Sequence, residues 1–112
     1  MENTIFVKFF GDSPKIRVLD MLITGRELDY SKSDIAEQAG IGRATFYRLL
    51  DGLLDSKIII LTRKIGNIQL YKLNQNNKDM KKIVELYDFL IRNASNMEIE
   101  RQRKKEVIKV IK

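Results

Sequence analysis

Four residues near the middle of the chain have side chains suited to binding nucleic acid: Arg43, Thr45, Tyr47 and Arg48. An arginine guanidinium can hydrogen-bond to O6 and N7 of guanine in the major groove, or it can bind a phosphate. Thr45 can donate to a phosphate or contact a thymine methyl group, and Tyr47 can contact the DNA backbone. Together they predict a DNA-contacting surface.

Each of these residues also has a simpler interpretation. The two arginines can be solvated, or they can pair with the nearby carboxylates of Asp51 and Asp55. Thr45 can fill the flank of a helix, and Tyr47 can pack on a neighbouring element. The sequence leaves these alternatives open.

Most other site chemistry is excluded by composition. The chain has no cysteine and no histidine, which rules out thiol catalysis, Cys/His zinc sites and histidine acid–base chemistry. Residues 40–46, GIGRATF, have the wrong glycine spacing for a phosphate-binding loop and lack its lysine. We therefore expect no enzyme, no metal and no cofactor, and no small-molecule effector is evident. No apolar run approaches the roughly 18–20 residues of a membrane span, so we expect a cytoplasmic protein without a membrane role.

The basic character of the chain is unevenly distributed. The net charge is +6, but residues 101–112 hold six Lys/Arg and one Glu and so account for +5 of it. A high overall pI is thus weak support for nucleic-acid binding. The local balance from Gly42 to Lys64 is stronger support, with five Lys/Arg against two Asp.

The four candidate residues lie on a predicted helix from Arg43 to Ser56. At 100° per residue they occupy the side opposite to, or flanking, its apolar face. The residues of that buried face are Phe46, Leu49, Leu50, Leu53 and Leu54. The helix is therefore expected to bury its leucines and expose its polar N-terminal half.

A shorter helix is predicted just before it, from Tyr30 to Ala39 including its entry turn. Ser31 or Ser33 can cap this helix, and its buried face is narrow, with Ile35, Ala36 and Ala39. Gly40 can adopt the left-handed conformation that ends a helix. The stretch SDIAEQAGIGRATFYRLLDGLL therefore predicts two helices joined by a tight turn, a helix-turn-helix.

A basic β-hairpin is predicted directly after these helices, from Ile58 to Leu73. The segment Lys57–Arg63 is rich in β-branched residues, and Ile68–Leu73 alternates apolar and polar residues. Gly66 and Asn67 form the turn between them. Arg63 and Lys64 fall near the hairpin tip, where they can contact DNA or can act as edge-strand charges that discourage aggregation.

Two elements are predicted before the helix-turn-helix. Residues 4–10, TIFVKFF, are too short for periodicity to distinguish a helix from a strand, and they can join a dimer interface. A helix from Pro14 to Thr24 follows, with Ser13 as its N-cap and Gly25 as its stop.

The C-terminal segment, residues 76–112, is predicted to form a long helix, because its apolar residues recur every three or four positions and so form a stripe on one face. Because a 75-residue domain has little room for such a stripe, we expect a dimerisation helix; the alternative is that the stripe covers the domain's own core. Asn93–Asn96 are weak helix formers and can interrupt it. Arg101, Arg103, Lys104 and Lys105 give it a basic tail, which is either solvated or contacts DNA or a partner. The predicted interface residues are Met80, Ile83, Val84, Tyr87, Leu90, Ile91, Ala94 and Met97.

The segment IAEQAGIGRATFYRLLDGLLDSKIIILTRKIGNIQLYKLN resembles winged helix-turn-helix transcriptional regulators of the small archaeal and bacterial kind, and the preceding FGDSPKIRVLDMLI resembles their first helix. The resemblance covers about Phe9 to Asn74. It implies a mainly α fold with a small β-hairpin wing, with residues 1–75 as the DNA-binding domain and residues 76–112 as a dimerisation helix with a basic tail.

The resemblance also implies roles for individual residues. Arg43, Thr45, Tyr47 and Arg48 match positions that contact bases and phosphates, Arg63 and Lys64 match the wing, and Ser31, Lys32 and Ser33 match a helix start that meets phosphate. Asp51 and Asp55 depart from the pattern, because they place negative charge on the outward face. We expect a homodimer that binds double-stranded DNA sequence-specifically and regulates transcription. The alternatives are a winged-helix protein-interaction module, or an architectural or plasmid-partition DNA-binding module without operator specificity.

Overall fold

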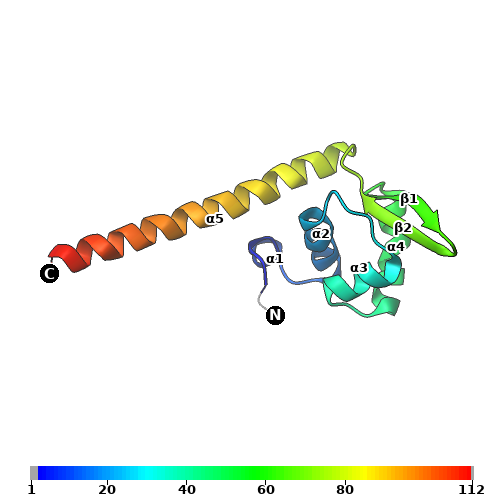
Figure 1. Ribbon diagram of the computed structural model, residues 1–112, viewed down its shortest axis with the longest axis horizontal. Coiled ribbons are helices and arrows are strands. Elements are labelled where there is room, and N and C mark those ends of the chain that lie inside the picture. Colours follow the sequence, from blue (N-terminus) through cyan, green and yellow to red (C-terminus); the bar gives the residue numbers. More distant parts are fainter. Residues whose placement is uncertain (1–2, 112) are drawn as a thin grey trace.

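Helices dominate the computed structural model, which describes the backbone of residues 3–111 and the side chains of residues 3–105. Within this range the order is α1, α2, α3, α4, a hairpin of β1 and β2, and a long α5 (Figure 1). Their bounds are α1 Ile5–Phe10, α2 Pro14–Thr24, α3 Lys32–Ala39, α4 Arg43–Asp55, β1 Ile59–Ile65, β2 Ile68–Leu73 and α5 Lys78–Ile111. The expected fold class, mainly α with a small β-hairpin wing, is confirmed.

Local capping residues set the helix ends. The Ser13 hydroxyl accepts from the backbone N–H of Ile16 at 3.2 Å, so α2 begins at Pro14 as predicted. Ser31 caps α3 in the same way, by accepting from the N–H of Asp34 at 3.1 Å. Gly40 ends α3 with a φ of 70°, a left-handed conformation that costs glycine little. Residues 5–10, whose type was undecided from sequence, are helical.

One hydrophobic core joins α1, α2, α3, α4, the hairpin and the first part of α5. The helices α1 to α4 and both strands contribute its fully buried side chains. These are Phe6, Val18, Leu22, Ile23, Ile35, Phe46, Leu53, Ile59 and Leu73. The predicted inner face of α4 is buried at Phe46, Leu50 and Leu53, whereas Leu49 and Leu54 are half-buried at its edge. This packing fixes which side of α4 is exposed.

The two-stranded hairpin is joined at one edge by a single bridge residue, Tyr30. β1 and β2 pair antiparallel, with a bulge between Leu61 and Arg63. Tyr30, just before α3, exchanges two backbone hydrogen bonds with Tyr71 of β2, at 2.7 and 2.8 Å. The loop from α2 to α3 is therefore bound to β2 through backbone hydrogen bonds. β1 starts later than predicted because Lys57 has a φ of 57°, which is incompatible with a strand.

The long helix α5 is continuous, so the expected interruption at Asn93–Asn96 is wrong. Its first half lies against α1 and α2, and its second half extends away from the rest of the chain (Figure 1). Met80 and Tyr87 are buried in the core, and the Tyr87 ring lies 5.1 Å from that of Phe6. Although α5 has 34 residues, neither it nor any other described helix is long and apolar enough to cross a membrane.

Candidate nucleic-acid interface

The N-terminal half of α4 presents the predicted contact residues to solvent. Arg43, Tyr47 and Arg48 are exposed, Tyr47 by 50%, and Thr45 is half-buried at the flank. Within residues 3–105 no ion pair joins either arginine to Asp51 or Asp55, so the pairing alternative does not describe this structure. Nε of Arg48 donates to the carbonyl of Ala44 at 3.4 Å, and within the described side chains neither guanidinium is held by a carboxylate.

The start of α3 and the tip of the wing meet beside this part of α4. A shallow hollow of about 180 Å³ is lined by residues from three segments: the N-cap Ser31 with Lys32 and Ser33 of α3, Tyr47 of α4, and the hairpin residues Asn67, Ile68 and Gln69. The Lys32 ammonium lies 5.9 Å from the centre of the Tyr47 ring, a cation–π distance. Three segments that the sequence analysis singled out separately thus form one concave surface.

The two wing cations differ in their surroundings. Nε and one terminal nitrogen of Arg63 donate to the two carboxylate oxygens of Asp29, at 2.9 and 3.2 Å. The Arg63 guanidinium, followed by the Thr62 hydroxyl, holds the pKa of Asp29 below its usual value. Lys64 is exposed and has no ion-pair partner within the described side chains. Sequence reasoning missed Asp29, because it lies in an aperiodic loop more than 30 residues from its partner.

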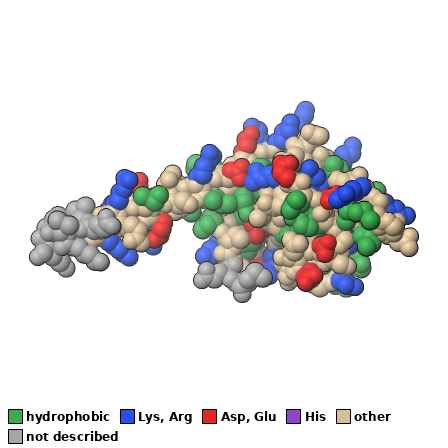
Figure 2. Space-filling view, viewed as in Figure 1, with side chains coloured by type: hydrophobic (Ala, Val, Ile, Leu, Met, Phe, Trp, Pro, Cys, Tyr) green, Lys and Arg blue, Asp and Glu red, His purple; other side chains and the backbone are tan. Residues whose placement is uncertain are grey.

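The predicted dimer residues divide into two groups. Met80 and Tyr87 pack in the chain's own core, with Ile83 and Val84 half-buried against it, which matches the alternative interpretation of the stripe. The remaining four are exposed or half-buried farther along α5, and they are Leu90, Ile91, Ala94 and Met97. Ile91 is 43% and Met97 58% exposed. Hydrophobic side chains are visible on the surface where α5 leaves the rest of the molecule (Figure 2).

The basic tail lies on the far half of α5. Arg101 pairs with Glu98 at 3.5 Å, one helical turn away. Arg103, Lys104 and Lys105 are exposed, and side chains from residue 106 onward lie outside the described part. Among the described residues no group of three or more acidic side chains could hold a metal ion.

A larger hollow of about 500 Å³ lies between α1, α2 and the end of α3. Val7, Met21 and Ala39 supply apolar lining, and Arg17 and Asp20 supply charge. The Arg17 guanidinium is already engaged by the carboxylate of Asp12. None of the predicted DNA-contacting residues lines this hollow.

Comparison with known proteins supports the fold. The sequence matches no protein-family model and no curated protein. Solved structures do match. The AntR antimony-specific transcriptional repressor has 22% sequence identity and a TM-score of 0.58, and the match covers 82% of this chain and 78% of that one. MepR, a transcription regulator of the Staphylococcus aureus multidrug efflux pump MepA, has 16% identity and a TM-score of 0.59, with 94% of this chain and 81% of that one covered. The adhesin competence repressor AdcR from Streptococcus pyogenes also matches, with 13% identity and a TM-score of 0.56. The match covers 76% of this chain, which spans 65% of the length of AdcR. At these identities the likeness establishes a winged-helix fold.

Proposed function

We propose that the chain is a transcriptional regulator that binds double-stranded DNA sequence-specifically as a homodimer. The observation that carries the proposal is the concave surface formed by the start of α3, Tyr47 of α4 and the wing tip. Arg43 and Arg48 are exposed on the same helix as Tyr47, and with Lys32 they lie on elements that can enter or flank a major groove. The similar structures are of proteins described as transcriptional regulators, which supports the same class.

In this proposal α4 lies in the major groove. Arg43, Thr45 and Arg48 contact base edges, and Tyr47 contacts the backbone beside them. Ser31, Lys32 and Ser33 bind phosphate at the positive end of α3, and the wing contacts the adjacent backbone. Asp51 and Asp55 are one and two turns farther along α4, where they lie farther from the phosphates than the helix start does.

The dimer half of the proposal rests on the exposed apolar side chains at one side of the molecule. Ile91, Ala94 and Met97 continue the stripe that Met80 and Tyr87 begin, past the point where the chain's own core ends. On α1, Phe9 is 63% and Phe10 43% exposed. A second copy that covered these side chains would place two α4 helices in successive major grooves, about 34 Å apart.

A protein-interaction module is the second candidate, because the wing itself exposes apolar side chains. Ile65 and Ile68, paired next to the turn, are 55% and 56% exposed. A DNA-binding surface built on Lys and Arg loses affinity steeply with salt, whereas an interaction module would show no duplex affinity above background at physiological salt. An architectural module would bind DNA with long footprints and little sequence preference.

One experiment tests the proposal directly. Bound sites are selected from a random duplex pool, and the oligomeric mass is measured on the same sample. We expect a short motif with two-fold symmetry and the mass of a dimer. Recovery of unenriched sequences would reject sequence specificity, and an asymmetric motif bound by a monomer would reject the dimer. The cytoplasmic location stays a prediction.

A further inference from the structure

Asp29 holds two neighbouring residues of the wing at once. Its Oδ2 accepts from the Thr62 hydroxyl at 2.8 Å and from Nε of Arg63 at 2.9 Å, and its Oδ1 accepts from the Arg63 guanidinium at 3.2 Å. The Asp29 side chain is only 20% exposed, while that of Arg63 is 62% exposed. The Asp29 carboxylate is therefore the more buried partner of the ion pair, and the more exposed Arg63 side chain reaches it from the wing.

The β-bulge makes this contact possible. Successive residues of a regular strand point to opposite faces, so Thr62 and Arg63 could not both reach one carboxylate. The register skips Thr62, since Leu61 pairs with Tyr71 and Arg63 pairs with Leu70. A bulge of this kind redirects side chains locally, and here it turns both toward the α2–α3 loop.

Lys64 lies on the other face of the hairpin. It pairs directly with Gln69, and cross-strand partners project from the same face of an antiparallel pair. Gln69 lines the hollow that contains Lys32 and Tyr47. Lys64 therefore shares the face of the proposed DNA contact, whereas Arg63 is directed toward Asp29.

We propose that Asp29 is a positioning residue for the wing: it holds the bulged strand against the α2–α3 loop and neutralises Arg63, so that Lys64, and not Arg63, supplies charge near the wing tip to DNA phosphates. This inference rests on the proposed DNA binding. It changes the expected role of Arg63 from a DNA contact to an ion-pair partner of Asp29 that holds the wing to the α2–α3 loop. An arginine whose charge is balanced by a carboxylate releases few counterions when a phosphate approaches. The Tyr30–Tyr71 backbone bridge, next to Asp29, holds the same loop to β2 and keeps the carboxylate in place.

The salt dependence of duplex binding tests this assignment. Each phosphate contact adds about 0.9 to the slope of log K against log salt, or roughly a 3.5-fold larger loss of affinity between 50 and 200 mM salt. We expect Lys64→Ala to flatten the slope by about 0.9 and Arg63→Ala to leave it unchanged. Asp29→Asn should release Arg63 and steepen the slope by about 0.9, and the double variant Asp29→Asn/Arg63→Ala should return to the wild-type slope.

A second measurement is independent of DNA. In the free protein, the Nε–H signal of Arg63 in ¹⁵N NMR spectra should be protected from solvent exchange, and Asp29→Asn should abolish that protection. Equal flattening by Arg63→Ala and Lys64→Ala in a protein that binds DNA would overturn the inference alone. An unprotected Nε–H in the wild-type protein would overturn it as well. A wild-type protein that binds no duplex at any salt would overturn the proposed function, and the DNA part of the inference with it.

Discussion

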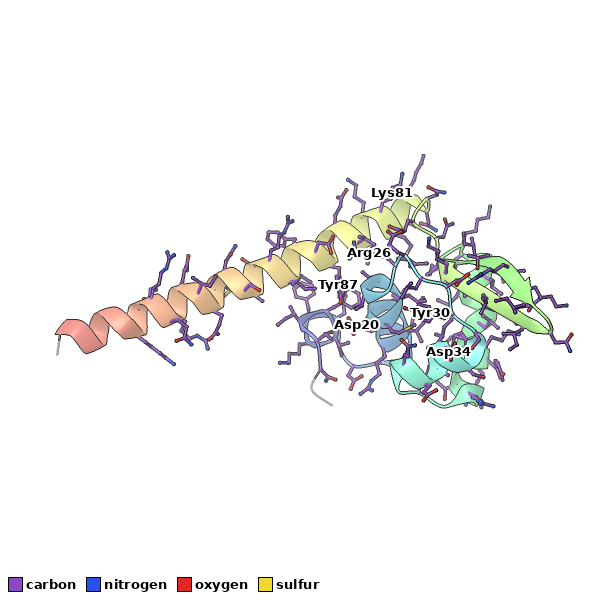
Figure 3. All side chains as sticks on the ribbon, in the orientation of Figure 1. Asp20, Arg26, Tyr30, Asp34, Lys81 and Tyr87 are labelled. Carbon is purple, nitrogen blue, oxygen red and sulfur yellow. The ribbon has the colours of Figure 1, made fainter. Side chains whose placement is uncertain are left out.

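The hydroxyl of Tyr87 lies 2.7 Å from Oγ1 of Thr24 and joins α5 to the end of α2. Because the Thr24 hydroxyl already donates to the carbonyl of Asp20 at 2.8 Å, Tyr87 is the donor to Thr24. Figure 3 shows Tyr87 directed from α5 toward α2, close to Asp20. The ring also contacts Phe6 of α1, so three helices meet at this one side chain.

Removal of that hydroxyl should weaken the junction in a pH-dependent way. We expect Tyr87→Phe to lower the free energy of unfolding by about 1 kcal/mol at pH 7. Burial raises the pKa of Tyr87. A raised pKa in the folded state gives stability that is present below the unfolded value of about 10 and is lost as pH rises through the folded value. Between about pH 8 and 11 the melting temperature should fall less steeply with pH for Tyr87→Phe than for wild type. Parallel pH dependences of the two melting temperatures would contradict the prediction.

Arg48→Ala should weaken binding to the selected site by about 1–3 kcal/mol and relax preference at one base position. The matched control is Lys81→Ala, which removes the same charge from an exposed position on α5 that projects away from α4 (Figure 3). Competition binding with a set of single-base site variants provides the measurement. If Arg48→Ala weakened every sequence equally, Arg48 would be a phosphate contact instead.

The proposed dimer should depend on the exposed end of the α5 stripe. Glutamates at Ile91 and Met97 would place charge in an apolar interface, and we expect monomers in sedimentation velocity runs. Because these two side chains lie outside the chain's own core, the melting temperature of the monomer should still report a folded domain. The control is Asn96→Glu, because Asn96 lies about 160° around the helix from the stripe residue Ala94, and it should leave the dimer intact. Dimers that persist in the Ile91/Met97 variant would move the interface to Phe9 and Phe10 of α1.

Gly25→Ala should destabilise the loop between α2 and α3. A Cβ at this position would overlap the hydroxyl of Tyr30, so the Tyr30 ring must shift from its present position. We expect a loss of about 1–3 kcal/mol, typical of an overpacked site, in urea denaturation. Tyr30→Phe removes the overlapping atom, so the double variant should recover part of the loss. A Gly25→Ala protein as stable as wild type would show that Tyr30 moves at no cost.

Most of the fold could be predicted because short local signals determine it. Ser13 with Pro14 starts α2, and Gly40 ends α3, and each acts on backbone groups within one helical turn. The continuity of α5 could not be predicted in this way. Asn93 and Asn96 each cost only a few tenths of a kcal/mol in a helix that is already propagating, so they do not break it.

The contact surface was only partly predictable. The exposed side of α4 follows from its apolar periodicity, and the structure places Tyr47 there beside Lys32. The pairing of Arg63 with Asp29 depends on a bulge and on a loop bound to β2, which leave no periodic signal. Likewise, no spacing distinguishes a stripe that covers the chain's own core at Met80 from one that meets a second copy.

The loop of residues 26–30 is held at both of its ends. Arg26 makes a two-bond ion pair with Asp88 of α5, at 2.7 and 3.1 Å, and Tyr30 is bridged to Tyr71 of the wing. Elements tied in this way open as one cooperative unit in native-state hydrogen exchange. The amides of β2 and of the first half of α5 should therefore share one opening free energy, and the wing would not fray as a separate hairpin.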